Sequence, residues 1–414
     1  MIPLRRLGAV RVSLPLLVAL TAAGLTACRD GAPDASPDCQ SPGVTSDKVV
    51  AGLLYPDTGP LAGEFSAFRG GVEARLGVAA QEGGVNGRQL VYEWADDQAQ
   101  PSINLVAAQH LVDDQNVFGI MEVTTAASGS AKWLNEQGIP VTGHADESVW
   151  SNYENMFSYS YFLGSGNGVD TYGLFVKRAG GTRAVVMSIW GNEFSTKASD
   201  AVAASLEAVG IPVVDRIEVT PGITNPSATA ARIRALDADV LVSYATESEF
   251  ARTVNLARQA GVDIKVVLAP NGYGSADQPL DWPVGSYTSL VYHPFESGSP
   301  GIARFREAMS EFVPQVRPAT SSVALHGWIT ADMFVRGLRE AGPCPTRESF
   351  IRGLRGVKSY DADGIIVNRV DFGQNLGVAD LCLSFVQFDG PAKGWHVVPG
   401  ADSLCGTHLT TPAR

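Results

Sequence analysis

The 414-residue sequence lacks the patterns that mark most catalytic and metal-binding sites. No two of its five cysteines have the CxxC spacing, and its six histidines form no cluster, which argues against a metal site. It has neither the GxSxG turn of serine hydrolases nor the HExxH helix of zinc proteases. The run GSGNG at 164–168 fails the dinucleotide pattern GxGxxG, because Val169 holds the place of the last glycine. We therefore expect no enzyme activity, no metal and no cofactor.

Basic residues are also few. The chain has 31 Lys and Arg against 43 Asp and Glu, a formal net charge of −12. Nucleic-acid binding needs a basic surface to meet the phosphates, so this balance argues against a nucleic-acid partner. Long apolar runs are absent apart from LPLLVALTAAGL near the N-terminus, which is shorter than the ~20 residues of a membrane-spanning helix.

That N-terminal run has the order of a secretory signal peptide. Arg5, Arg6 and Arg11 precede it, and no acid occurs before Asp30. It ends in LTAC, which resembles the bacterial lipobox, in which the cysteine, here Cys28, is acylated and becomes the new N-terminus. The alternative is plain secretion with an incidental Cys28. Removal of residues 1–27 would leave 28 basic and 43 acidic side chains, a formal net charge of −15.

The mature chain divides into a tether and two expected domains. Residues 28–43 are rich in Pro, Asp, Ser and Gly and have little to bury, which is typical of a solvated tether. The folded part is expected to begin near Val44. About 370 mature residues exceed one hydrophobic core and favour two domains.

Short β-branched runs alternate with helical patterns through most of the chain. Such alternation predicts α/β lobes, each with a mainly parallel sheet flanked by helices. The predicted strands are 48–55, 89–97, 117–123 and 139–145, then 182–189, 211–219, 239–246 and 265–270. Two further helices, at about 301–313 and 320–341, precede a hairpin over 381–398, and the chain is expected to return to its first lobe after building the second. The predicted ranges are 44–163 and 292–381 for lobe 1, 164–291 and 382–405 for lobe 2, and 406–414 for a C-terminal tail.

Three motifs in the first half carry a family resemblance. They are Thr58-Gly59-Pro60, the run GGVNGR at 83–88, and Asp96-Asp97-Gln98. In their order and spacing the chain resembles the Leu/Ile/Val-binding type of ABC-transporter solute-binding protein over most of 45–390. The resemblance implies the periplasmic binding protein fold, in which three crossovers join two lobes that close on a ligand by hinge bending. It also implies a small-molecule ligand and the permease subunits of an ABC importer as partners.

Ligands of open α/β sheets bind beyond the carboxyl ends of the strands. Thr124 and Thr125 follow one such strand, where hydroxyls and the free amides of a helix start can hold a carboxylate. The resemblance places a Ser/Thr carboxylate clamp here and backbone amides at His144, Ala145 and Asp146. The alternatives are simple helix capping by the threonines and a surface-loop role for His144.

Aromatic residues at the other predicted strand ends are candidates for the walls of the ligand site. The resemblance points to Phe65, Phe194 and Tyr244, and Trp190 adjoins the same region; the alternative for each is ordinary packing. Asn271 stands where amino-acid binders of this type place an acid for the ligand ammonium. Either Asp146, Glu193 or Glu247 replaces that acid, or the ligand has no free α-ammonium.

Cys39, Cys344, Cys382 and Cys405 remain after lipidation of Cys28, and an even number in an exported protein favours two disulfides. Three pairings are possible; we expect Cys344 with Cys382 and Cys39 with Cys405.

The sequence thus predicts an exported lipoprotein, anchored by lipid to the outer face of the cell membrane. It would capture a small polar solute, such as an amino acid, an amide or a related carboxylate, for an ABC importer. The alternative is a ligand-sensing lipoprotein that reports to a membrane signalling partner.

Overall fold

The computed structural model describes residues 39–162, 168–269, 272–274 and 281–410. All of them belong to one compact unit, which begins at Ser36. The predictions that concern Cys28 and Asn271 lie outside the described residues. No helix in the described part is long and apolar enough to cross a membrane.

The first sheet is entirely parallel and has the strand order β2-β1-β3-β4-β5. The strand predicted over 48–55 is confirmed by β1. The bounds are β1 Lys48–Tyr55, β2 Gln89–Asp96, β3 Ile120–Glu122, β4 Val141–Gly143 and β5 Met156–Ser158.

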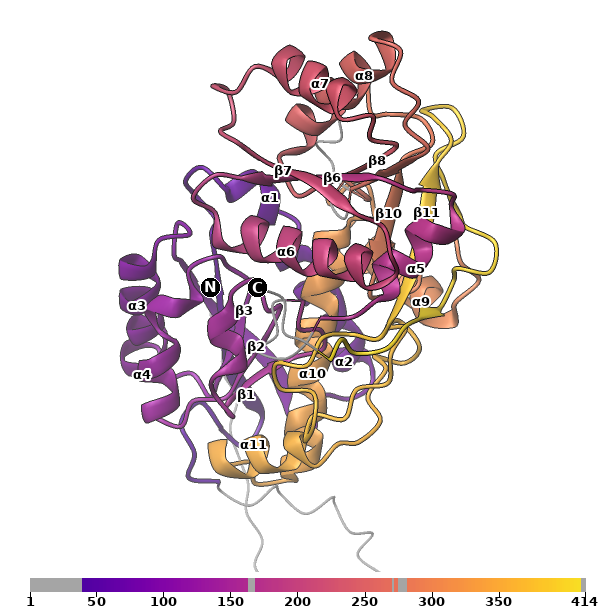
Figure 1. The fold of residues 1–414 in the computed structure, drawn as a ribbon. Coiled ribbons are helices and arrows are strands. Elements are labelled where there is room, and N and C mark those ends of the chain that lie inside the picture. The colour runs from indigo at the N-terminus through magenta and orange to yellow at the C-terminus, as the bar shows by residue number, and fades with distance from the viewer. Residues whose placement is uncertain (1–38, 163–167, 270–271, 275–280, 411–414) are drawn as a thin grey trace, which may run out of the picture. The chain divides into compact units, whose positions relative to one another are not determined.

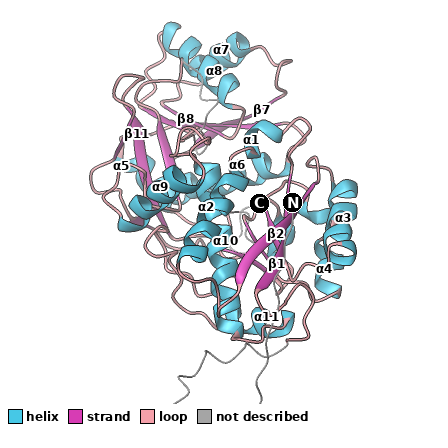
Figure 2. Cartoon of the chain, turned by 180° about the vertical axis from the view of Figure 1, so that it is seen from behind, coloured by secondary structure: helices cyan, strands magenta, loops and turns pink. Residues whose placement is uncertain are grey.

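Helices cover both faces of this sheet, which explains why β1 is continuously apolar from Val49 to Leu54. Leu53 packs in the core beneath α2 (Phe68–Gln81), α9 (Pro300–Phe312) and α10 (Ser322–Ala341). Leu54 faces the opposite core, with α3 (Pro101–Gln109) and α4 (Ala131–Glu136), because successive residues of a strand point to opposite faces. Figure 2 shows β1 and β2 between α3 and α4 on one side and α2 and α10 on the other.

The second sheet is mixed, with the order β12-β11-β10-β9-β8-β6-β7, and β13 pairs with β11. The strands from β6 to β10 are parallel, and β11 to β13 pair antiparallel, which confirms the predicted hairpin. The bounds are β6 Ala184–Ile189, β7 Val213–Val219, β8 Val240–Ser243, β9 Val266–Leu268, β10 Tyr287–Leu290, β11 Cys382–Phe388, β12 Trp395–Val397 and β13 Leu404–Cys405.

Four helices accompany this second sheet. They are α5 (Thr171–Arg178), α6 (Glu193–Ala208), α7 (Pro226–Ala235) and α8 (Glu247–Gln259). The last two lie side by side (Figure 1) and pack on one face, while α5 and α6 pack on the other. The predicted α/β class with two mainly parallel sheets is confirmed.

The chain passes between the two sheets three times: after β5, after β10 and before β11. The prediction missed α11 (Arg347–Arg355), a short helix that begins with a capping box of Thr346 and Ser349. Its amphipathic repeat is only two turns long, too short to stand out in the sequence.

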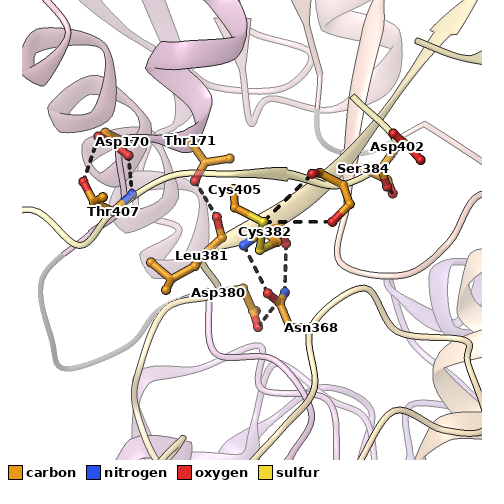
Figure 3. Close-up of a disulfide and its surroundings, with 11 residues drawn as sticks. Asp170, Thr171, Asn368, Asp380, Leu381, Cys382, Ser384, Asp402, Cys405 and Thr407 are labelled. Carbon is orange, nitrogen blue, oxygen red and sulfur yellow. Dashed lines mark hydrogen bonds between the residues drawn. A yellow bond between two sulfur atoms is a disulfide. The ribbon is translucent and has the colours of Figure 1, made fainter. Parts of the chain in front are cut away.

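The predicted disulfide pairing is wrong. The structure joins Cys39 to Cys344 and Cys382 to Cys405, instead of Cys344 to Cys382 and Cys39 to Cys405. Cys382 and Cys405 are direct partners in the β11–β13 ladder, with Cα atoms 3.9 Å apart (Figure 3). Cysteine spacing did not reveal that the last strand pairs with β11, and this pairing decides the bond.

Candidate ligand-binding site

Thr124, which directly follows β3, is engaged within the protein. It is fully buried, and its hydroxyl accepts a hydrogen bond from the Ala126 amide at 3.2 Å. The same hydroxyl also bonds to the Asp97 carboxylate. Thr125 is half-buried, and no other described residue forms a hydrogen bond with its hydroxyl. Of the two predicted threonines, only Thr125 therefore offers a free hydroxyl.

A buried polar group that the sequence analysis missed lies beside Thr124. Asn104 on α3 donates from Nδ2 to Asp97 Oδ2 and to Glu122 Oε1, each at 3.0 Å. Burial raises the pKa of Glu122 to about 8, and the nearby charge of Asp97 adds to the effect. The only sequence signal was an acid in the otherwise apolar run VFGIMEV.

One backbone amide of the loop after Thr125 has a partner within the protein. The N–H of Ser128, in the turn Ala127–Gly129, donates to Glu147 Oε2 at 3.1 Å. Burial raises the pKa of Glu147, and the charge of Glu193 contributes in the same direction. Of the donors in this loop, the Ser128 amide thus already binds an anion supplied by the chain.

His144 and Asp146, predicted together after β4, are in direct contact. His144 Nδ1 lies 2.8 Å from Asp146 Oδ1, and the imidazole stacks on that of His326 at 4.3 Å between centroids. Burial opposes protonation of His144, but the charges of Asp146 and Asp380 outweigh it and raise its pKa. Burial and the adjacent His144 hold the pKa of His326 well below its usual value. The stack therefore favours protonation of His144 and disfavours protonation of His326.

Side chains from the three crossovers surround this histidine pair. Tyr159 follows β5, and its ring lies 5.7 Å from that of His144; Tyr292 follows β10, and its ring lies 5.9 Å from that of His326. Asp380 precedes β11 and accepts hydrogen bonds from Ser160 Oγ at 2.5 Å and Asn368 Nδ2 at 3.4 Å. Figure 3 shows Asp380 and Asn368 beside the Cys382–Cys405 disulfide. The sequence prediction missed these residues, because each crossover lies far from the others in the chain.

The second sheet contributes an aromatic cluster. Phe194 at the start of α6 and Tyr244 after β8 have ring centroids 6.1 Å apart, and Phe162 lies 6.0 Å and 5.6 Å from them. The structure thus brings two predicted aromatic residues together and adds Phe162. Trp190 is 67% exposed, whereas Phe65, in the short helix Ala62–Phe65, packs in the core of the first sheet. Ala145 is buried.

One hydrogen bond links the segments that follow β4 and β6. Ser148, in the turn Ser148–Ser151, donates from Oγ to Glu193 Oε1 at 2.8 Å, and Lys197 Nζ lies 2.8 Å from the same oxygen. The two sheets therefore face each other here through polar groups at the carboxyl ends of their strands.

The chain is similar to known proteins in sequence. The profile of a family described as periplasmic binding protein matches residues 48–394. A Leu/Ile/Val-binding protein homologue of Brucella melitensis is 24% identical over 241 residues, which are 57% of this chain. The matched segment spans 64% of that relative's length.

Solved structures share the fold at low sequence identity. A fatty acid ABC transporter substrate-binding protein from Thermomonospora curvata superposes with a TM-score of 0.68 at 17% identity, covering 90% of this chain and 95% of that one. A leucine-binding protein from Thermotoga maritima gives a TM-score of 0.65 at 19% identity, with coverages of 84% and 97%. Because these two proteins are named for different solutes, the shared fold does not specify a ligand.

Proposed function

Because this chain belongs to the periplasmic binding protein family, as a member of the branched-chain amino acid type, we propose that it captures a small polar solute between its two sheets for an ABC importer. The observation that carries the proposal is the meeting of polar side chains from the three crossovers with His144 and Asp146. Side chains at a hinge can change their contacts when a ligand binds between two lobes and the lobes close on it.

Amino acids, amides and related carboxylates are the first solute classes to test, since the Brucella relative is named for Leu, Ile and Val. The proposed contacts are Thr125, His144 and Asp146 on the side of the first sheet. Phe194, Tyr244 and Trp190 are the proposed contacts on the side of the second. Thr124 and Ala145 are proposed to position this loop region, and Phe65 and Asn271 remain proposed contacts from the family resemblance.

We propose that the protein acts outside the cytoplasm, attached by an acyl group on Cys28. The signal-like N-terminus and the sequence LTAC support this proposal. Mature protein should partition into detergent, and Cys28→Ser should release it into the aqueous phase. Aqueous partitioning of the mature wild-type protein would contradict the lipid anchor.

The proposal is tested by a thermal-shift screen of amino acids, amides, short-chain carboxylates, amines and aromatic acids. A ligand at a hundred times its Kd stabilises the folded state by about 2.7 kcal/mol, which gives a measurable rise in Tm. We expect at least one class to raise Tm in a saturable way. If no class does so, solute capture is not supported.

A further inference from the structure

We propose, on the premise of this solute-binding function, that the solute carries a cationic nitrogen, an ammonium or guanidinium, which Asp380, Asp146 and the Tyr159 hydroxyl receive where the three crossovers meet. This site differs from the Thr124–Ser128 loop, to which the family resemblance assigns the ligand carboxylate.

The Tyr159 hydroxyl is the first observation behind this proposal. Tyr159 is 2% exposed, and its hydroxyl has no hydrogen-bond partner among the described residues. Burial raises the pKa of this phenol, and the charges of Asp146 and Asp380 act in the same direction. Asp146 contacts His144, whose ring lies 5.7 Å from that of Tyr159, and Asp380 accepts a hydrogen bond from Ser160, the next residue in the chain. A buried hydroxyl without a partner is unfavourable, and a bound cation that donates a hydrogen bond to its oxygen would remove that cost.

The charge balance around this hydroxyl is the second observation. In the described part of the chain, Asp146 contacts one basic side chain, that of His144. Asp380 is held by neutral donors, Ser160 Oγ and Asn368 Nδ2, and neither carboxylate forms an ion pair with a lysine or arginine in the described part of the chain. Two carboxyl groups thus face one imidazole, and burial raises the pKa of Asp380 to about 6, so a negative charge here is poorly solvated. A bound cation would neutralise negative charge on these carboxyl groups, whereas a bound anion would be repelled by it.

The aromatic surroundings favour the same class of ligand. The rings of Tyr159 and Tyr292 flank the His144–His326 stack, and their faces attract cations. His326 is disfavoured for this role, because burial and the adjacent His144 hold its pKa well below the usual value. A carboxylate ligand is less favoured, because the Ser128 amide, one of the donors that could bind it, is already hydrogen-bonded to Glu147.

Calorimetry with matched solutes tests the charge preference. The probes are isoamylamine against isovalerate, and putrescine against succinate, with leucine as the solute that has both groups. We expect each amine to bind at least tenfold more tightly than its acid counterpart. An acid that binds as tightly as its amine, or a neutral solute that binds while all the amines fail, would overturn the cationic subsite and leave the solute-binding function standing. Failure of every solute in the wider screen would count against both.

Two variants locate the subsite with the tightest-binding amine. Asp380→Asn keeps the acceptor oxygen but loses the charge, and should raise the Kd at least tenfold. Asp263→Asn, a change of an exposed carboxylate before β9, is the matched control and should leave the Kd unchanged. Retention of wild-type affinity by Asp380→Asn would overturn the assignment.

The Tyr159→Phe variant distinguishes an effect on ligand binding from an effect on stability. Because it removes a hydroxyl that has no partner in the described chain, it should leave Tm unchanged or raise it, while weakening amine binding severalfold. Tyr161→Phe is the control, since the Tyr161 hydroxyl already donates to the Met156 carbonyl at 3.5 Å. If Tyr159→Phe binds the amine like wild type, the hydroxyl has no part in the subsite.

Discussion

Glu122 is a carboxyl group at the end of the short, buried strand β3. It is fully buried, and among the described residues its carboxyl group accepts a hydrogen bond only from Asn104 Nδ2. Its pKa is raised from 4.5 to about 8 by burial and by the charge of Asp97. In the unfolded chain this group ionises near its usual pKa, so the folded state holds a proton that the unfolded state has lost between these two values. Glu122 therefore makes the protein less stable as the pH rises through that window.

Glu122→Gln should remove this pH dependence. Glutamine keeps an oxygen to accept from Asn104 but cannot ionise, so the variant should gain stability relative to wild type, on the order of a few kcal/mol, as the pH rises from 5 to 8. Chemical unfolding at several pH values measures the difference. Glu136→Gln, at an exposed helical pair with Lys132, is the control, and its difference from wild type should stay nearly constant. A constant difference for Glu122→Gln as well would refute the raised pKa.

Thr124 and Thr125 are neighbours with different expected roles. If Thr125 holds a polar end of the solute, Thr125→Ala should weaken binding about ten- to a hundredfold, the equivalent of one charge-assisted hydrogen bond, with little change in the ligand-free Tm. Thr124→Ala should instead lower the free energy of unfolding by about 1–3 kcal/mol, because it leaves the buried Asp97 with one donor fewer. Calorimetry and chemical unfolding of both variants distinguish these roles. Identical behaviour of the two variants would contradict the assignment.

At the scale of elements, the α2–α10 contact holds the first sheet's helical layer together. Gly71 on α2 and Gly327 on α10 allow the two backbones to approach closely. A Cβ at Gly71 would lie 1.7 Å from the Ala324 carbonyl oxygen, and one at Gly327 would lie 2.1 Å from that of Phe68. Backbone atoms cannot move aside as a flexible side chain can, so the helices would have to separate.

Gly71→Ala should therefore destabilise the protein by about 1–3 kcal/mol, although alanine is the better helix former. Urea unfolding measures the change. Gly298→Ala is the matched control: Gly298 has no atom near the position of an added Cβ and no positive φ, so its stability should change little. A neutral Gly71→Ala would show that the two helices do not pack so closely in solution.

At the scale of the whole molecule, the three crossovers are the only covalent connections between the two sheets among the described residues. A solute that contacts both sides stabilises a closed arrangement by its difference in affinity for the open and closed states. Small-angle scattering should therefore show a smaller radius of gyration when the tightest solute from the screen is saturating. An unchanged radius at saturation would contradict hinge closure.

The sequence alone predicted the features that depend on local patterns. The strand over 48–55, the hairpin near 381–398 and the two βα series follow from hydrophobic periodicity and turn residues, which act over a few positions. The aromatic pair Phe194 and Tyr244 could be proposed because the family resemblance places aromatic residues at these positions.

Only the tertiary structure decided which distant residues meet. Cys39 bonds with Cys344 across 305 positions, and Asp380 reaches Ser160 across 220. The Ser128 amide is hydrogen-bonded to Glu147, and the Thr124 hydroxyl is hydrogen-bonded to Asp97. From the sequence alone, both donors would be available to a ligand. The reason is physical: periodicity determines which face of an element is buried, but the pairing of strands and the path of the crossovers determine which side chains share the space beyond the strand ends.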